Sequence, residues 1–447
     1  MTGGLLDPLD GDEVVDQAVD DAALLRAMLD VEAALARAVA RVGLASRAAA
    51  DAVARTAESI EIDVDELGRL GVEPGNPVVP LVRELEAAVP EGARDSVHLG
   101  ATSQDILDTA LQVLARRALE PILEYLDRAG DAAAELATAH RDTPMIARTL
   151  GQPALPSTFG LRAAVWRAGL AATAARLAEV RDAELAVQLG GAVGSLAAYG
   201  DAGPQVAAQL AAELGLNDPG LPWHTERSRV HALAAALGAA IAGCGKVATD
   251  IVLMSRHDAG EVAESSPGGS SAMPHKRNPV QSVLVIAAAR RAPGLVATLL
   301  ASGLHEQERA TGSWHAEWPA LRELLRLAGG AAARTAAALA GLQVDRDAMR
   351  RNLDSAGPGV YSEALAGRLL PVLGRTAAQD AVRRALDAAP GGGPDLVAAL
   401  RTDAAVADAV SAEEIIALLE PARYLLAANR LVDRTLRQAA ERRTEHP

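Results

Sequence analysis

Apolar residues recur every three or four positions along most of the chain, which is the period of an amphipathic helix. Leu24–Val42 is typical, because apolar positions fall on one face, charged residues lie between them, and Gly43 follows as a helix stop. The same period predicts further helices over residues 110–139, 161–188, 206–214, 229–256, 280–302, 318–342 and 412–443. Helices therefore dominate the predicted structure.

Two features of this pattern predict how the helices are arranged. No segment alternates convincingly between apolar and polar residues, so strands should be few. Val230–Met254 is apolar or small on nearly every side, which predicts a helix buried all round in the middle of a bundle. Long helices joined by short loops form such bundles. We therefore predict an all-α fold, with a long central helical bundle and smaller helical N- and C-terminal domains.

Three breaks in the helical pattern mark candidate domain boundaries. Gly71–Pro80 is rich in Pro and Gly, the long helices give way to shorter ones around Leu342–Asp347, and Pro390–Pro394 is a flexible connector. The predicted division is an N-terminal helical domain over residues 1–95, a central long-helix bundle over 96–345 and a C-terminal helical domain over 346–447.

Composition and charge narrow the classes of function. The chain has 447 residues, 50% of them hydrophobic but only 2% aromatic, so its core must be built from Ala, Leu and Val. A net charge of −15 and a pI near 5.1 argue against nucleic-acid binding, because no bulk positive field is present to neutralise phosphates. A few local Arg and Lys residues can still bind a small anionic substrate.

The chain shows no pattern for export or membrane insertion. Met1–Asp21 is acidic and lacks the basic-then-apolar order of a signal peptide. The apolar, uncharged stretch Ala232–Gly245 is too short to span a bilayer. Cys244 is the only cysteine, which excludes an intramolecular disulfide and is typical of a reducing compartment. We expect a cytoplasmic protein without a membrane partner.

The segment Gly268–Pro279 interrupts helical sequence with Gly, Ser and Pro and is predicted to be a loop. It holds Ser270 and Ser271 beside Lys276 and Asn278. A serine hydroxyl acts as a base only when its alkoxide is stabilised, and a nearby lysine with backbone N–H groups can do that. The glycines would let the loop close over a substrate and expel water. The alternative is an ordinary solvated loop between helices.

A second polar segment, Val97–Thr109, has the form of a helix start. Thr102 and Ser103 stand where an N-cap belongs, and the free N–H groups of a helix start attract a carboxylate. These hydroxyls either bind a ligand or only cap the helix. His98, just before them, is a proton carrier, an anion donor or a structural histidine.

Two further segments carry polar groups outside the helical pattern. In Arg148–Gly160, Thr149 and Gln152 are candidate substrate contacts, although a buried Gln can equally satisfy loop backbone, and Arg148 can pair with a carboxylate of the protein.

In Glu306–Trp318, Arg309 is a candidate clamp for a substrate carboxylate. The tryptophans of this segment, Trp314 and Trp318, are interpreted as a packing cluster. No metal-ligand spacing and no phosphate-binding glycine loop are found, so we expect neither a metal nor another cofactor.

Gly269–Pro279 resembles the signature of the fumarase/aspartase superfamily, Gly-Ser-Ser-x-Met-Pro-x-Lys-x-Asn-Pro, and matches it at every defined position. The resemblance implies an all-α homotetramer whose active sites combine segments of different subunits. It also implies that Ser270 is the catalytic base, with Ser271 supporting it, and that Thr102 and Ser103 bind a carboxylate. Most of the superfamily has a His where this chain has Leu150, so one usual acid/base group is missing.

Several segments resemble one branch, the bacterial 3-carboxy-cis,cis-muconate cycloisomerases, which also lack the histidine at this position. They are Ala27–Ala38, Gly75–Val82, Val97–Thr109, Glu308–Trp318 and Asn352–Gly357. The branch implies interconversion of 3-carboxy-cis,cis-muconate and 4-carboxymuconolactone in protocatechuate breakdown. The substrate is then a di- or tricarboxylate. Gly357–Glu363 departs from the pattern expected there and leaves room for an altered substrate.

Two other functions stay open. One is a lyase that releases fumarate from a substituted succinate, of the nitrosuccinate, argininosuccinate or adenylosuccinate kind. Leu150 counts against the last of these, but not against a small leaving group that needs no proton. The other is a protein that kept the fold and lost the chemistry, against which the intact Ser270, Lys276 and Asn278 argue.

Overall fold

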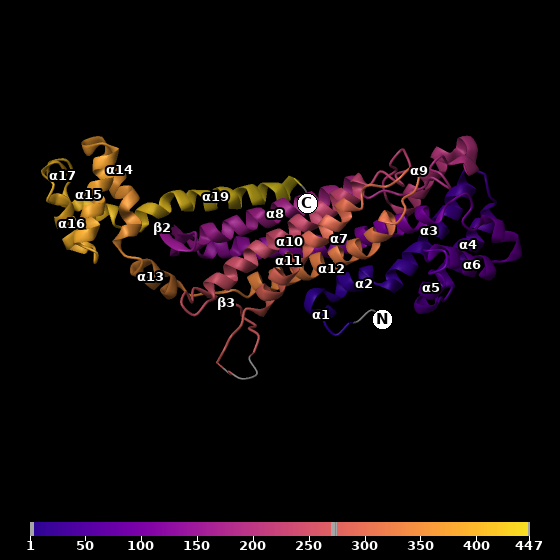
Figure 1. Cartoon of the computed structure of the whole chain (residues 1–447), viewed down its shortest axis with the longest axis horizontal. Coiled ribbons are helices and arrows are strands. Elements are labelled where there is room, and N and C mark those ends of the chain that lie inside the picture. Colours follow the sequence, from indigo (N-terminus) through magenta and orange to yellow (C-terminus); the bar gives the residue numbers. More distant parts are fainter. Residues whose placement is uncertain (1–3, 270–272, 274, 446–447) are drawn as a thin grey trace. The chain divides into compact units, whose positions relative to one another are not determined.

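The computed structural model describes residues 4–269, 273 and 275–445, with side chains as far as residue 438. Figure 1 labels its elements along the ribbon. The helices are α1 (Asp7–Asp10), α2 (Glu13–Val19), α3 (Asp21–Arg41), α4 (Arg47–Ser59), α5 (Val64–Leu70), α6 (Val78–Ala88), α7 (Ser103–Ala139), α8 (Phe159–Ala183), α9 (Gly203–Leu214), α10 (Ser228–Met254), α11 (Val280–Ala301), α12 (Ser313–Ala340), α13 (Arg346–Ser355), α14 (Ser362–Leu373), α15 (Arg375–Ala388), α16 (Gly393–Arg401), α17 (Ala404–Ala409), α18 (Ala412–Leu418) and α19 (Ala422–Glu445). Short 3₁₀ turns are η1 (Glu91–Ser96), η2 (Ala197–Ala202) and η3 (Pro358–Tyr361). The predicted all-α fold is confirmed.

Some helix ends differ from the predicted ends, either because polar residues extend a helix or because a proline divides it into two. Helix α7 begins at Ser103 rather than near residue 110, because a polar first turn precedes its apolar stripe. Helix α3 ends at Arg41, and Gly43 follows with a φ of 85°, as the stop signal predicted. The single helix predicted over residues 412–443 is two, α18 and α19, with Pro421 between them.

Strands are few, as predicted, but a hairpin is present that the sequence pattern did not predict. β1 (Pro144–Thr149) pairs antiparallel with β2 (Gln152–Thr158), with a register shift between Ile146 and Arg148. Leu150 and Gly151 form the turn with φ angles of 53° and 80°, as a two-residue hairpin loop requires. The strands contain prolines and alternate poorly, which is why the pattern did not predict them. A second pair joins β3 (Val262–Ala263) to β4 (Gln343–Val344).

The described chain folds into two compact units, neither of which is one continuous segment. Helices α7, α8, α10, α11 and α12 contribute residues to both units. The predicted three-part division by residue number stays a prediction. Unit 1 comprises Met1–Arg128, Leu170–Ala248 and Ser282–Ala336, and unit 2 comprises Ala129–Gly169, Thr249–Gln281 and Ala337–Pro447.

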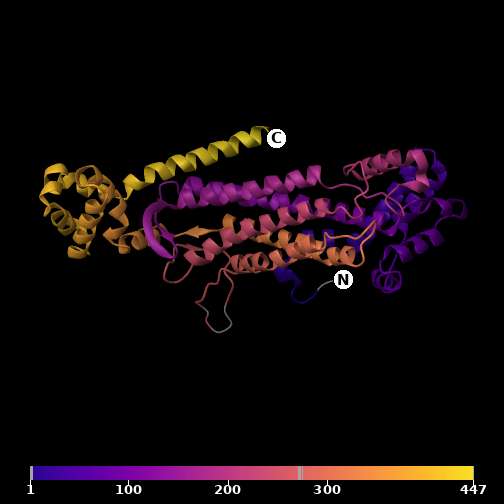
Figure 2. The ribbon, with the colours of Figure 1, turned by 45° about the horizontal axis from the view of Figure 1, so that its top comes forward.

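Unit 1 contains a bundle of long helices, which lie side by side in both Figure 1 and Figure 2. Glycines of α10 permit close packing against α11. A Cβ atom on Gly245 would lie 2.7 Å from the Cβ of Ala289, and one on Gly238 would lie 2.9 Å from Val296. Because real Cβ atoms do not approach so closely, only glycine fits between these helices.

The prediction that Val230–Met254 is buried on every side is wrong for this chain by itself. One stripe of α10 is exposed, at the helical spacing of three or four residues. It consists of Ala235, Ala239, Ala242, Lys246, Thr249 and Leu253. Helices α10 and α11 would be long and apolar enough to cross a membrane by length and composition alone, but 56% of the most apolar window of α10 is buried. Burial of that extent is typical of a core helix of a bundle.

Unit 2 has a separate apolar core in its C-terminal part. Helices α14 to α18 bury a cluster of mostly aliphatic residues that includes Leu365, Val382 and Leu396. Helix α13 packs against β1, where Ile146 and Leu353 are buried together.

Candidate active site

Helix α7 begins in the segment that carries Thr102 and Ser103. The backbone N–H of Thr102 donates to the Asp105 carboxylate over 3.0 Å, so this carboxylate caps the helix. Within the described residues, neither hydroxyl of Thr102 or Ser103 forms a hydrogen bond, and both residues are half-buried. The hydroxyls therefore stand unused beside the positive end of a long helix, where an anion is favoured.

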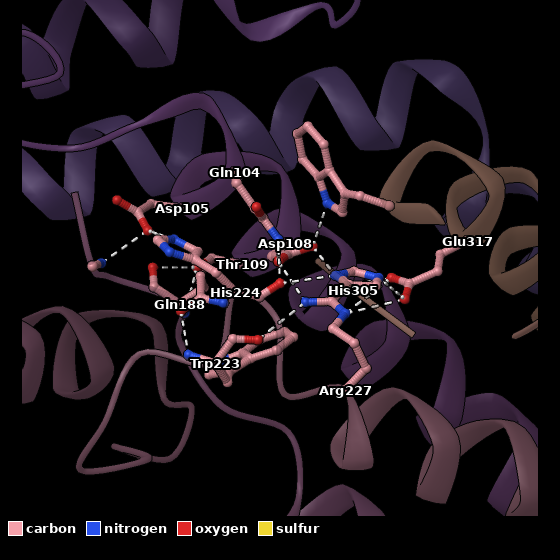
Figure 3. Close-up of polar contacts among 12 residues, drawn as sticks. Gln104, Asp105, Asp108, Thr109, Gln188, Trp223, His224, Arg227, His305 and Glu317 are labelled. Atoms are coloured by element: carbon pink, nitrogen blue, oxygen red, sulfur yellow. Dashed lines mark hydrogen bonds and ion pairs between the residues drawn. The ribbon is translucent and has the colours of Figure 1, made fainter. Parts of the chain in front are cut away.

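Asp105 is fully buried and joins this helix start to a second loop (Figure 3). It accepts hydrogen bonds of 2.9 Å from the N–H groups of both Gly190 and Gly191. His224 places its Nε2 atom 2.7 Å from the same carboxylate. Four donors thus surround one buried carboxylate, which satisfies it and holds the backbone of Thr102 in place.

A cluster of buried charges lies one helical turn further along α7. Arg227 donates to Asp108 over 2.8 Å and 3.1 Å, and to Glu317 over 2.5 Å and 3.1 Å. His305 places its Nε2 atom 3.2 Å from Glu317 (Figure 3). Burial opposes ionisation of Asp108, but the Arg227 guanidinium outweighs it and holds the pKa of Asp108 below its usual range. Almost no solvent reaches these ion pairs, so little water screens them.

Gln104 connects this cluster to Arg309. The amide nitrogen of Gln104 donates to Asp108 over 3.0 Å, and its oxygen accepts from Arg309 over 3.1 Å. Arg309 also donates to the carbonyl oxygen of Ala192 over 2.9 Å and to that of Gly191 over 3.4 Å. Within the described residues its Nε–H makes no hydrogen bond, so part of the guanidinium stays available to a ligand.

His98 lies in the loop that leads into α7, and a buried carboxylate holds it there. Glu32 of α3 accepts from the His98 ring at Nδ1 over 2.6 Å and from the His98 backbone N–H over 3.1 Å. Burial lowers the pKa of His98, but the charge and hydrogen bond of Glu32 outweigh it, and the pKa is raised overall. The imidazole is thereby oriented by the protein rather than by solvent.

The tryptophans of the 306–318 segment form the predicted packing cluster. The rings of Trp314 and Trp318 meet edge to face with centroids 4.6 Å apart, and His315 lies against both. The Trp314 indole also donates to Asp108 over 2.9 Å. The cluster therefore encloses the buried charges from one side.

The signature segment is described only in part. Ser270 and Ser271 lie outside the described residues. The segment begins and ends at an antiparallel bridge, in which Gly268 and Asn278 exchange backbone hydrogen bonds of 2.9 Å and 3.1 Å. Lys276 is exposed, and Asn278 is half-buried. These residues belong to unit 2, whereas Thr102, Ser103, His98 and Arg309 belong to unit 1.

The β1–β2 hairpin of unit 2 fixes Arg148 and exposes the turn. Arg148 forms a two-point ion pair with the buried Glu261, over 2.9 Å and 2.8 Å, so it pairs with a carboxylate of the protein. Leu150 is fully exposed at the tip, and Thr149 and Gln152 beside it are exposed as well. In a single chain neither Thr149 nor Gln152 is enclosed by a site.

The structure adds residues that the sequence analysis did not single out. Glu32, His224, Arg227 and Glu317 belong to the network around the predicted site residues of unit 1 without having been predicted. Asp105 did have a local signal, because Thr102-Ser103-Gln104-Asp105 has the Ser/Thr-x-x-Asp form of a helix N-cap. No cluster of metal-ligating side chains occurs among the described residues.

Comparison with known proteins covers nearly the whole chain. The family profile described as lyase matches residues 12–294, and the profile described as adenylosuccinate lyase C-terminus matches residues 358–435. A nitrosuccinate lyase of Streptomyces davaonensis is 43% identical over 98% of this chain and 95% of its own length. A 3-carboxy-cis,cis-muconate cycloisomerase of Bradyrhizobium diazoefficiens is 40% identical over 97% of both.

Solved structures agree with these relatives. The crystal structure of the 3-carboxy-cis,cis-muconate lactonizing enzyme of Pseudomonas putida superposes with a TM-score of 0.89 at 38% identity, covering 98% of this chain and 99% of that one. Two of these relatives carry the branch name that the sequence segments indicated, and the third is a lyase. This chain is an enzyme that belongs to the lyase family of the fumarase/aspartase superfamily.

Proposed function

We propose that this enzyme interconverts 3-carboxy-cis,cis-muconate and 4-carboxymuconolactone, a step in the breakdown of protocatechuate. In the lactonising direction a carboxylate oxygen adds to a carbon–carbon double bond, and a proton joins the carbon next to another carboxylate. The reverse step removes that proton and expels the carboxylate oxygen. Substrate and product are isomers, so neither water nor a cofactor enters the balance.

The observation that carries this proposal is the agreement of relatives over more than nine-tenths of the chain. Proteins named for this cycloisomerase match from Bradyrhizobium diazoefficiens at 40% identity and from Pseudomonas aeruginosa at 42%. The unit 1 site supports it chemically, because free hydroxyls at a helix start and a partly available Arg309 suit a substrate with several carboxylates.

The proton transfer is assigned to the signature segment. Ser270 is the base in the elimination direction and the acid in the lactonising direction, and Ser271 supports the loop or substitutes for it. The transition state carries a second negative charge on the carboxylate next to the reacting carbon. Lys276 and Asn278 stabilise that charge, and preorganised donors of this kind usually contribute most to catalysis.

The substrate carboxylates are assigned to unit 1. Thr102 and Ser103 anchor the carboxylate next to the reacting carbon, and Arg309 binds a further one. His98 is the second proton carrier, a role for which a fixed and partly buried imidazole is suited. Thr149 and Gln152 contact the substrate bound by a neighbouring copy of the chain, because in their own chain they are exposed.

A second candidate is release of fumarate from nitrosuccinate or a related substituted succinate. The nitrosuccinate lyase of Streptomyces davaonensis, at 43% identity, favours it. Leu150 is compatible with both candidates, because a carboxylate and a nitrite are weak bases that leave without a proton. An apolar residue therefore suffices where an acid would serve a more basic leaving group.

We also propose that the enzyme is a homotetramer with shared active sites, in the cytoplasm. The exposed stripe of α10 is mostly small residues, and only 22% of the most apolar window of α11 is buried in the single chain. Faces of this kind pack closely against other helices. Dilution to monomers, followed by light scattering, should abolish activity, and an active monomer would refute shared sites.

The test of the reaction is to incubate the purified enzyme with 3-carboxy-cis,cis-muconate and, separately, with nitrosuccinate and other substituted succinates. Loss of the conjugated-diene absorbance with lactone formation, seen by NMR, is the expected result. Fumarate release from a succinate, without muconate turnover, would replace the first candidate by the second. Turnover of neither, with retained binding of a dicarboxylate, would reject both.

A further inference from the structure

Glu32 makes an unusual pair of contacts for a buried carboxylate. Its side chain has no exposed surface, yet its ion-pair partner in the described chain is a histidine rather than an arginine or lysine. One carboxylate oxygen lies 2.6 Å from His98 Nδ1, and the other lies 3.1 Å from the His98 backbone N–H. The same carboxylate therefore holds both the main chain and the ring of one residue.

These two contacts determine how the imidazole is presented. A carboxylate only accepts hydrogen bonds, so Nδ1 must carry a hydrogen, and the proton that exchanges is the one on Nε2. His98 also has a φ of 52°, a left-handed conformation that costs free energy for a residue other than glycine. The Glu32 contact to the backbone N–H offsets that cost.

Three carboxylates on different helices act on His98. Glu32 faces it from α3, Glu86 from α6 and Asp105 from α7, and each raises the pKa of His98. Tyr199 of η2 donates to the carbonyl oxygen of Leu99 over 2.8 Å. Burial, with Asp105 and Glu32 nearby, raises the pKa of Tyr199, so it remains a neutral donor.

Both ends of the loop from His98 to Thr102 are thus held by buried carboxylates. Glu32 holds the His98 end, and Asp105 holds the Thr102 end through its backbone N–H. Ser103 follows directly as the first residue of α7. The loop therefore presents an imidazole and two hydroxyls from one fixed piece of backbone.

We propose that Glu32 is a positioning residue of this enzyme, which fixes the His98 ring by its Nδ1 atom so that Nε2 is the atom that exchanges a proton with the substrate. The inference rests on the proposed function, because His98 is the second proton carrier of that reaction and Glu32 is assigned as its partner. Glu32 itself touches no substrate.

The test is the pH profile of kcat/KM, which reports groups of the free enzyme. Glu32→Gln keeps the shape of the side chain and removes its charge. The limb of this profile that reports His98 is the one that disappears in His98→Gln. In Glu32→Gln the same limb should move to lower pH by about one unit, because an adjacent carboxylate favours the protonated imidazole. Glu32→Asp, which keeps the charge but shortens the reach, should give a smaller shift in the same direction.

Asp30→Asn is the matched control. It removes one carboxylate from the same helix, but Asp30 pairs with Arg26 and Arg117 at the surface. The limb should stay where it is in the wild type. A limb that moves equally in Asp30→Asn and Glu32→Gln would overturn the proposal, since it would then report the general loss of charge. A His98 limb that stays at its wild-type pH in Glu32→Gln would also overturn the proposal.

A second measurement needs no activity. Because the folded pKa of His98 is raised, its interaction with Glu32 stabilises the fold below the ordinary histidine pKa and is lost as the pH rises through the raised value. His98→Gln should therefore lower Tm at about pH 6 in the wild type but not in Glu32→Gln, and the difference should shrink at about pH 9. Equal effects in both backgrounds would overturn the pairing. If no substrate is turned over while this coupling is found, the proposed function fails and the Glu32–His98 pair stands.

Discussion

The start of α7 and the signature segment carry the two halves of the proposed chemistry, and the structure holds them very differently. Around α7, buried carboxylates and a guanidinium satisfy one another, and the predicted ligand-binding groups are attached to that network. In the signature segment the described lysine is exposed, and one backbone bridge closes the loop. The groups around the start of α7 are therefore held within a single chain, whereas the lysine described in the signature segment is exposed in it.

The difference in burial determines how strongly each cation interacts with the charges around it. Arg227 is about as buried as its partners, so its ion pairs act with little solvent between them. Lys276 is surrounded by water in the single chain, where its charge is screened. A cation of the first kind mainly stabilises the fold, and a cation of the second kind can contribute to catalysis only when water is expelled.

Ser270→Ala should have the largest effect. It removes the proposed proton carrier, so kcat should fall by a factor on the order of a thousand, as removal of a positioned acid or base does. Stability should not change, because loop serines contribute little to a core. Steady-state kinetics measure the fall in kcat, and thermal unfolding checks that stability is unchanged. Ser271→Ala is the matched control and should be milder. Near-normal turnover in Ser270→Ala would remove the assignment.

Arg227→Met should destabilise the protein strongly without touching the signature segment. It leaves Asp108 and Glu317 buried without their cation, and the free energy of unfolding should fall by about 3–5 kcal/mol. Urea denaturation measures it. Arg256→Met is the control, because its pair with Asp258 is 60% and 68% exposed. That variant should stay within about 1 kcal/mol. Equal losses would contradict the contrast between buried and exposed cations.

Gln104→Met should weaken substrate binding more than turnover. It removes the group that connects Arg309 to the buried cluster, so KM should rise about tenfold, the loss of roughly one hydrogen bond to a charged group. In an Arg309→Met background, Gln104→Met should cause no further rise in KM. Gln112→Met makes the same substitution on the same helix at a residue that is likewise buried, 1% exposed against 0% for Gln104, and away from Arg309. A rise in KM shared by both variants would assign the effect to α7 in general.

Lys276→Met and Arg277→Met should have the smallest effects on stability. Both side chains are exposed, so the free energy of unfolding should stay within about 0.5 kcal/mol of the wild type in each. Only Lys276→Met should lower turnover, since only Lys276 is assigned to the transition-state charge. Melting curves and initial rates test the pair together. A strongly destabilised Lys276→Met would mean that the loop is already part of the fold.

Local pattern singled out candidate ligand-binding groups but not the groups that hold them. Thr102, Ser103 and His98 lie close together in the sequence, so a helix start was enough to single them out. Glu32 and Arg227 are 66 and 119 residues away from the groups they bind, His98 and Asp108. Nothing in a local window distinguishes a buried carboxylate partner from a solvated glutamate, so these residues were not predicted.

The hairpin and α10 mark the same limit for the fold. The proline-containing strands around Leu150 have no clear alternation, and they pair only because the turn residues adopt positive φ angles. Helix α10 is apolar all round, which predicted complete burial, but a single chain leaves one stripe exposed. Apolar composition indicates that a face will be covered, not whether its own chain covers it.

Helical period and short motifs depend on neighbouring residues, so the helical architecture, the family signature and the candidate hydroxyls, lysine and arginine could all be predicted from the sequence. Which of these groups are held in place depends on packing between distant segments. The carboxylates of Glu32, Asp105 and Asp108 find His98, His224 and Arg227 after distant segments pack together. A charge becomes a fixed, strong partner only when packing excludes water from it, and no stretch of chain can bring that about alone.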